Sequence, residues 1–349
     1  MVDIAMMKDR DCQSVFTLNR TKMVLNNIRF FRSFATMVKS LPFLSLISII
    51  CLSSCADSSP ANQDAGDLTI VCTTGMVADL VKALSDSSAT TTFVVPTGLD
   101  PHTYRATPDD VSQIMGANAV LYSGLGLEAK FETILSNYGK DPNHHVFSLG
   151  QHLPDSLLVT IEDEEGHGSE VDPHFWFDVE LWKMAAQGVA KDLASIDPEG
   201  AEGYQKRLEA YLLQLEALDA WCKKELESID TSNRVLVTVH DAFTYFARHF
   251  EFDVRGLQGI SPEIEAGVYD VSNMVNYLVE NDIQAVFVEE SLPTKTMEAV
   301  VSGCLSKGHV VSIGEPLLAD NVGVAGTEEG TYIGMVKYNV RALVEGLGK

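Results

Sequence analysis

Residues 68 to 96 read LTIVCTTGMVADLVKALSDSSATTTFVVP, a pattern that indicates the fold class. The runs LTIVCTT and TTTFVVP are short and rich in β-branched residues, which is typical of strands. Between them, MVADLVKALS has the apolar spacing of an amphipathic helix. Two strands separated by a helix predict a parallel pair, because parallel strands need a long crossover connection.

The alternation of strand and helix continues along the chain in two series. One ends near residue 150 and the other begins at Arg234, so the sequence predicts an α/β protein with two lobes of similar size, each a parallel sheet with helices on both faces. The first series continues with PDDVSQIMGA, AVLYSG, EAKFETILSNYG and HVFSLG. The second contains RVLVTV, AFTYFARHF, DVRGLQG, a helix around Asp270 to Val279, AVFVEE, a helix around Met297 to Cys304, HVVSIG and a helix from Tyr332 to Leu347.

An almost wholly helical segment, residues 179–230, links the lobes expected at 68–178 and 231–349. The motif SIDPEG interrupts this segment near Pro198, because proline ends a helix. We interpret the second half as one long helix that braces the lobes of a monomer. A coiled-coil dimer is the alternative, but the apolar stripe is only about two heptads long. The stripe consists of Leu208, Tyr211, Leu212, Leu215, Leu218 and Cys222.

An export signal is expected at the N-terminus. The apolar run LPFLSLISIICL, Leu41 to Leu52, is too short for a mature membrane span but suits a signal peptide. It leads into Leu-Ser-Ser-Cys, the small-residue pattern before the acylated cysteine of bacterial lipoproteins. We therefore expect a signal at 1–54, lipid on Cys55 and a polar tether at 55–67. An ordinary signal or a helical anchor is the alternative, and the start codon could be Met1 or Met37.

The net charge argues against a nucleic-acid-binding protein, and the cysteine content argues against a disulfide-stabilised one. With 25 Lys and Arg against 49 Asp and Glu, the formal charge is −24, which argues against nucleic-acid binding. Of six cysteines, Cys72, Cys222 and Cys304 lie after the expected tether, far apart and without a CxxC pair. We interpret these three as buried small side chains and not as a disulfide framework.

Four residues predict a metal site. His102 follows the run TTTFVVP, His240 ends RVLVTV and Asp320 follows HVVSIG, and ligands of parallel sheets bind beyond such carboxyl ends. His174 lies in a second Asp-Pro-His tripeptide like that of His102, and the proline stiffens the loop. Three imidazoles and one carboxylate suit Zn²⁺, Mn²⁺ or Fe²⁺.

Six motifs resemble the cluster A-I metal-binding proteins of bacterial ABC transporters, the TroA/ZnuA/PsaA-like family. They are DPHTYRATPDDV, DPHFWFD, VTVHDAFTYFARHF, GLQGISPE, VFVEESLP and IGEPLLADNVGVAGTEEGTYIGMV, and they occur in order between Leu68 and Leu347. The resemblance implies two (βα)4 lobes joined by a rigid backbone helix, with the metal between them.

By motif, the family's ligands correspond to His102, His174, His240 and Asp320. At position 240 this chain has His and so resembles TroA-like and zinc-binding members, whereas manganese-specific members usually have Glu there. The long His-rich loop of many zinc members is missing from residues 151–171, so the resemblance implies zinc or manganese, with iron as a third candidate.

Two glutamates are weaker candidates for the site. Glu265 and Glu289 could accept hydrogen bonds from ligand imidazoles, although surface or capping roles are equally open. The resemblance implies a receptor that is no enzyme: it captures a metal outside the cytoplasmic membrane, on a lipid anchor, and passes it to a permease with its ATPase. A surface adhesin or structural lipoprotein is one alternative. An exported zinc hydrolase is the other, but the sequence has no HExxH motif.

Overall fold

The computed structural model describes residues 68–162 and 169–348. The expected signal at 1–54, the lipid site Cys55 and the tether at 55–67 lie outside the described residues. Within them, no helix is both long enough and apolar enough to cross a bilayer.

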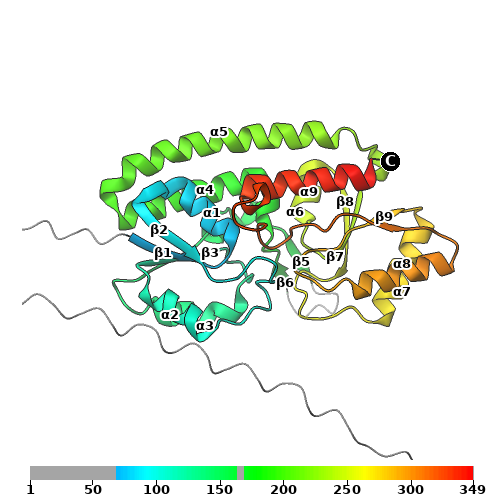
Figure 1. Ribbon diagram of the computed structural model, residues 1–349, viewed down its shortest axis with the longest axis horizontal. Coiled ribbons are helices and arrows are strands. Elements are labelled where there is room, and N and C mark those ends of the chain that lie inside the picture. Colours follow the sequence, from blue (N-terminus) through cyan, green and yellow to red (C-terminus); the bar gives the residue numbers. More distant parts are fainter. Residues whose placement is uncertain (1–67, 163–168, 349) are drawn as a thin grey trace, which may run out of the picture. The chain divides into compact units, whose positions relative to one another are not determined.

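The N-terminal lobe contains a four-stranded parallel sheet with the order β2-β1-β3-β4 (Figure 1). Alternate residues of β1 pack into different cores: Ile70 and Cys72 face α1 and α4, whereas Val71 faces α2 and α3. Both faces are therefore buried, as a parallel sheet requires. The elements are β1 (Leu68–Cys72), α1 (Gly75–Ser85), β2 (Ala89–Phe93), α2 (Pro108–Gly116), β3 (Ala119–Tyr122), α3 (Glu132–Tyr138) and β4 (His145–Ser148).

The C-terminal lobe has two parallel strand pairs, β7-β8 and β9-β10. The backbone N–H of Phe287, just after β9, donates to the carbonyl of Val237 on β7 at 2.8 Å, which joins the pairs in the order β8-β7-β9-β10. This repeats the order of the first sheet. The elements are β7 (Val235–His240), α6 (Thr244–Phe250), β8 (Asp253–Gln258), α7 (Val268–Glu280), β9 (Ala285–Val286), α8 (Lys295–Ser306) and β10 (Ser312–Ile313).

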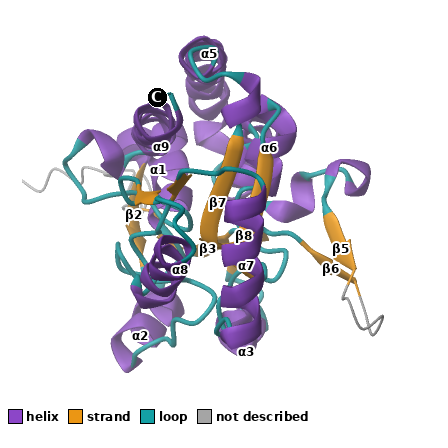
Figure 2. Cartoon of the chain, turned by 90° about the vertical axis from the view of Figure 1, so that its right-hand side faces the viewer, coloured by secondary structure: helices purple, strands orange, loops and turns teal. Residues whose placement is uncertain are grey.

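Three helices connect the lobes: α4 (Val179–Ile196), α5 (Ala201–Leu226) and α9 (Tyr332–Leu347). The predicted break at Pro198 separates α4 from α5. Helix α5 packs along α9 (Figures 1 and 2). Its stripe is buried as expected except for Leu212, which is half-buried.

The largest core is shared by the two lobes and the connecting helices. Tyr332, at the start of α9, stacks on Trp182 of α4 with ring centroids 4.4 Å apart and donates its hydroxyl to the carbonyl of Trp176 at 2.7 Å. Each lobe also has a smaller core of its own. The connecting helices are therefore part of the folded interior and do not form a flexible linker.

A polar network supports the same region. His249 on α6 contacts Asp178, at the start of α4, at 3.3 Å and Asp219 on α5 at 2.6 Å. Burial lowers the pKa of His249, but the two carboxylates outweigh burial and raise it above the usual value. The His249 imidazole therefore links three helices, and the two carboxylates favour its protonated form.

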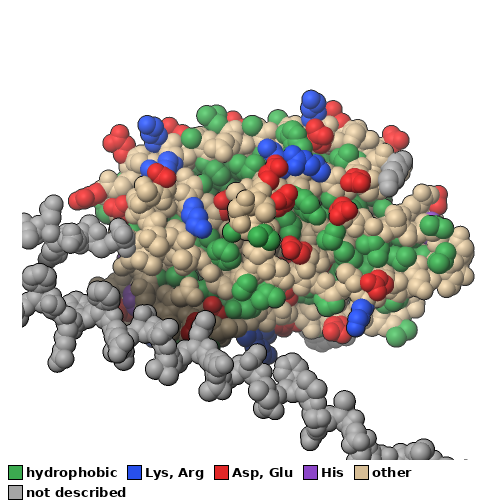
Figure 3. Space-filling model, in the orientation of Figure 1, with side chains coloured by type: hydrophobic (Ala, Val, Ile, Leu, Met, Phe, Trp, Pro, Cys, Tyr) green, Lys and Arg blue, Asp and Glu red, His purple; other side chains and the backbone are tan. Residues whose placement is uncertain are grey.

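A hairpin absent from the sequence prediction, β5 (Thr160–Glu162) with β6 (Ser169–Val171), stands apart from the two larger sheets (Figure 2). On the face in Figure 3, acidic side chains are spread among apolar and basic ones. The three described cysteines, Cys72, Cys222 and Cys304, are free and buried, and burial raises the pKa of each thiol.

Candidate metal centre

The four residues predicted from the sequence converge at one buried point. One nitrogen or oxygen from each of His102, His174, His240 and Asp320 lies within 4.8 Å of the others. His174 and His240 are fully buried, Asp320 is 1% exposed and His102 is 5% exposed. His240 ends β7, while His102 and Asp320 follow β2 and β10, so the cluster lies at the carboxyl edges of both sheets.

The cluster has polar atoms that the protein leaves unsatisfied. His174 Nε2 lies 3.3 Å from His102 Nε2 and 3.3 Å from Asp320 Oδ1, and His240 Nε2 lies 3.5 Å from Asp320 Oδ2. Among the described residues, His240 Nε2 and both Asp320 oxygens nevertheless lack a hydrogen bond of good geometry. Buried polar atoms without partners are costly, so such a set suits a ligand. Imidazole nitrogen and carboxylate oxygen are donors that zinc and related cations accept.

Two carboxylates orient two of the imidazoles. Asp172 Oδ1 lies 2.7 Å from His174 Nδ1, and Glu289 Oε2 lies 3.2 Å from His240 Nδ1. With the proton on each Nδ1, the free Nε2 lone pairs point into the cluster. Glu289 also accepts the backbone N–H of Val239 at 3.0 Å, which fixes the carboxylate on β7.

The two sequence candidates beyond the four therefore differ. Glu289 contacts His240, as expected, whereas Glu265 is exposed and, among the described residues, forms no hydrogen bond or ion pair with the cluster. The second carboxylate that orients an imidazole is that of Asp172, which was not among the candidates predicted from the sequence. The signal was present, because Asp172 begins the second Asp-Pro-His unit.

The Asp-Pro-His units have a shared local structure. The backbone N–H of His102 donates to Asp100 Oδ1 at 2.8 Å, and that of His174 donates to Asp172 Oδ1 at 2.9 Å. Aspartate side chains form such turns with the residue two positions ahead. The aspartate thus shapes the loop that presents each histidine.

Burial and the carboxylates set the protonation of the metal-free site. Burial lowers the pKa of His174, but Asp172 and Asp320 outweigh it and raise this pKa to about 9. Burial likewise opposes charge on His240, yet Asp320 and Glu289 hold its pKa well above the usual value. Burial would raise the pKa of Asp320, but His240 and His174 hold it well below the usual value. Protons therefore occupy this site until a metal cation displaces them.

The third imidazole, that of His102, has a different environment. Burial dominates at His102 and lowers its pKa to about 3. Asp320 opposes this shift, but the charges of His174 and His240 add to it. His102 is therefore neutral across the physiological range and needs no deprotonation before it binds a metal.

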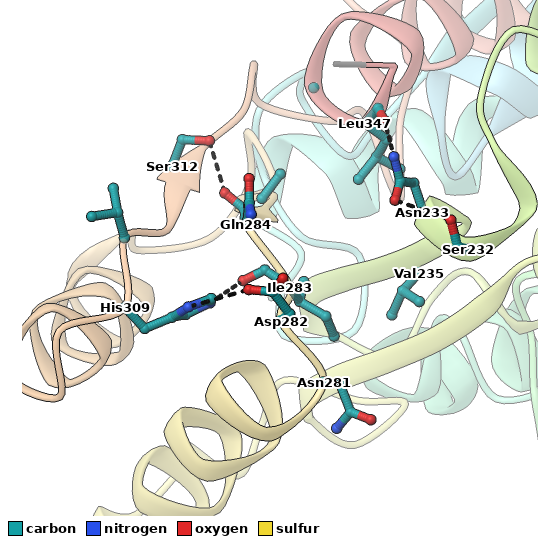
Figure 4. A pocket seen from close by; sticks show the side chains of 13 residues that line it. Ser232, Asn233, Val235, Asn281, Asp282, Ile283, Gln284, His309, Ser312 and Leu347 are labelled. Carbon is teal, nitrogen blue, oxygen red and sulfur yellow. Dashed lines mark hydrogen bonds and ion pairs between the residues drawn. The ribbon is translucent and has the colours of Figure 1, made fainter.

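A cavity of about 520 Å³ lies elsewhere, at the amino ends of β7, β9 and β10 (Figure 4). Its polar groups already have partners: His309 Nε2 contacts the carbonyl of Ile283 at 2.6 Å, and Ser312 donates to the carbonyl of Gln284 at 3.1 Å. None of the four clustered residues lines it. The buried cluster remains the better candidate site.

Comparison with known proteins gives one family. Residues 70–346 match the family model described as ZnuA, zinc-uptake complex component A, periplasmic. The manganese-binding lipoprotein MntA of Bacillus subtilis is 36% identical over 302 residues, covering 86% of this chain and 97% of the relative. The iron ABC transporter substrate-binding lipoprotein MtsA of Streptococcus pyogenes is 28% identical over 309 residues, covering 87% of this chain and 97% of that protein.

The zinc-binding protein TroA of Treponema pallidum matches in both sequence and structure. Its sequence is 37% identical over 284 residues, covering 81% of this chain and 90% of the relative. A solved structure of the same protein has a TM-score of 0.77 and covers 81% of this chain and 100% of that chain. The relatives differ in the metal that their names give.

Proposed function

The chain belongs to the ZnuA family of periplasmic zinc-uptake components, and from this premise we propose that it captures one divalent transition metal outside the cytoplasmic membrane and delivers it to the permease of an ABC importer. The metal ligands are His102, His174, His240 and Asp320. One observation carries this proposal: the four converge in the interior, where, among the described residues, His240 Nε2 and both Asp320 oxygens have no hydrogen-bond partner.

The donor set favours transport over catalysis. Four protein ligands fill a tetrahedral shell, whereas a catalytic zinc keeps one position for water. The cargo is a substrate that the protein binds and releases. We therefore propose a receptor without enzymatic activity.

The proposed cargo is zinc or manganese, with iron as a third candidate. Two histidines held by carboxylates suit zinc, which also binds such sites more tightly than manganese or iron. The named relatives cover zinc, manganese and iron, so availability and coordination geometry would decide between them.

The remaining parts of the proposal concern place and partners. We place the chain on the outer side of the cytoplasmic membrane, held by lipid on Cys55, as a monomer that works with a permease and its ATPase. The lipoprotein names of MntA and MtsA support the anchor. We keep 68–178, 179–230 and 231–349 as the domain boundaries.

Elemental analysis tests the proposed function. The chain from Leu68 onward, purified without a tag from a metal-balanced medium, should contain one equivalent of zinc, manganese or iron. The His102→Ala/His240→Ala double variant should contain none. If neither protein binds metal, the site is refuted and a structural or adhesive lipoprotein becomes the better reading. Hydrolytic turnover with a water-exchangeable metal would instead favour an enzyme.

A further inference from the structure

Asp320 differs from His174 and His240 in how its side chain is held. Both of its carboxylate oxygens lack hydrogen bonds among the described residues, although the side chain is only 1% exposed. The carboxylate contacts only the imidazoles of the cluster, His174 Nε2 at 3.3 Å and His240 Nε2 at 3.5 Å, and among the described residues no group outside the cluster donates to it. Its position depends on the backbone on either side of it.

That backbone is fastened to the other lobe. Asn321 Oδ1 accepts the N–H of Gly75, the first residue of α1, at 2.8 Å, and Asn321 Nδ2 donates to the carbonyl of Val95 at 3.2 Å. Asn321 is 7% exposed. Val95 lies just beyond β2, on the segment that leads to His102. One buried amide thus connects the loops of two proposed ligands.

The residue on the other side of Asp320 is also fastened. Trp176 Nε1 donates to the carbonyl of Ala319 at 3.0 Å. Trp176 is fully buried and lies two residues after His174. The loop that carries Asp320 therefore belongs to the C-terminal half of the sequence but is held by hydrogen bonds to the N-terminal lobe.

The packing at Asn321 leaves no room for adjustment. A Cβ at Gly75 would lie 2.7 Å from Asn321 Oδ1 and 2.7 Å from Val322 Cγ2, closer than real carbon contacts. Glycine at position 75 permits this approach. Asn321 Oδ1 also accepts the N–H of Val322 at 3.0 Å, which holds the amide in one orientation.

We propose that Asn321 is a positioning residue for metal capture: its amide fastens the Asp320 loop to the strand end that leads to His102 and so keeps the carboxylate within reach of the imidazoles. This inference rests on the proposed function. It adds that Asp320 stays with the N-terminal lobe, although it follows a strand of the C-terminal one.

The test compares three variants of the full chain with Zn²⁺ and Co²⁺ as probes. Asn321→Ala removes the side-chain amide. Gly75→Ala lies on the N-terminal lobe, and its added Cβ displaces the same amide. Asn118→Ala is the matched control, because Asn118 Oδ1 likewise accepts a backbone N–H, that of Thr69 at 2.8 Å, but away from the cluster. Competition with a chelator gives the Zn²⁺ Kd, thermal unfolding gives the stability of the metal-free chain, and Co²⁺ absorption reports the ligand geometry.

We expect Asn321→Ala and Gly75→Ala each to raise the Kd for Zn²⁺ at least tenfold and to change the Co²⁺ spectrum. Asn118→Ala should lower the unfolding midpoint but leave both readouts at wild-type values. Wild-type Kd and spectrum in a folded Asn321→Ala or Gly75→Ala variant would overturn the inference while the proposed function stands. If only one of the two folds, that variant decides. A wild-type chain that binds neither ion would instead refute the proposed function.

Discussion

The affinity for metal should depend on pH, and the slope of this dependence should equal the number of protons that the metal displaces from the site. The pKa of His174 is raised to about 9 in the metal-free chain. This pKa lies about two units above pH 7, so the His174 imidazole holds a proton that the metal must displace. At 1.36 kcal/mol per pKa unit, the displacement costs about 2.7 kcal/mol. His240, whose pKa is also raised, should release a second proton. His102, with a pKa of about 3, should release none.

The Kd for Zn²⁺ should therefore rise about 100-fold for each unit of pH between 8 and 6, since two protons are displaced. Chelator competition across this range measures the slope. Calorimetry in two buffers of different ionisation enthalpy counts the protons independently. A Kd that stays constant between pH 5 and 8 would rule out a histidine-dominated site, and three released protons would contradict the neutral state of His102.

The raised pKa of His174 has the opposite effect on the stability of the metal-free chain: it weakens metal binding at low pH but stabilises the fold there. A raised pKa stabilises the folded chain below the unfolded value of 6.5, and this stabilisation is lost as pH rises through about 9. Metal affinity and metal-free stability should thus change in opposite directions over that interval. Thermal unfolding with and without Zn²⁺ would separate the two.

Three further outcomes follow from the geometry. His102→Ala should lower Zn²⁺ affinity by orders of magnitude while circular dichroism and unfolding of the metal-free chain show an intact fold; loss of folding would contradict this. Glu289→Gln should weaken Zn²⁺ binding about 10- to 100-fold because an imidazole loses its orienting charge, whereas Glu265→Gln, at an exposed position, should match wild type; equal losses in both would argue against the contact. His249→Gln should reduce the free energy of unfolding by on the order of 1–3 kcal/mol at pH 5.5, in urea titrations. Its effect should shrink as pH rises through the raised pKa of His249, and a loss independent of pH would refute the charged bridge.

Much of the fold was predictable because local patterns and tertiary structure agree. The run from residue 68 gives β1, α1 and β2, and the last helix has the predicted bounds, Tyr332–Leu347. The β5-β6 hairpin was missed because its strands are only three residues each, too short for a periodic signal. The sharing of one core by both lobes also has no signature in local periodicity.

The members of the candidate site were also predictable from the sequence, but only some of the residues around them were. The four clustered residues lie at strand ends or in Asp-Pro-His units, both of which can be recognised in the sequence, and their role as ligands stays a prediction. For Glu265 the sequence left a surface role and an orienting role open, and the side chain is exposed, because a motif position does not reveal where a loop side chain points. Asp172 contacts a histidine only two residues away, so its Asp-Pro-His unit could have indicated its role. Asn321 instead bonds to Gly75, 246 residues away in sequence, and only the folded chain reveals that contact.

The burial of the three described thiols has a practical consequence for measuring motion. Cys72, Cys222 and Cys304 are free, buried and less acidic than an ordinary thiol, so their reactive thiolate is scarce at neutral pH. In a chain that begins at Leu68, a new cysteine at an exposed position such as Glu265 would be the thiol that reacts with a maleimide dye. With a second new cysteine at an exposed position on the other lobe, a pair of fluorescent probes could follow the separation of the lobes during metal uptake without removal of any native cysteine.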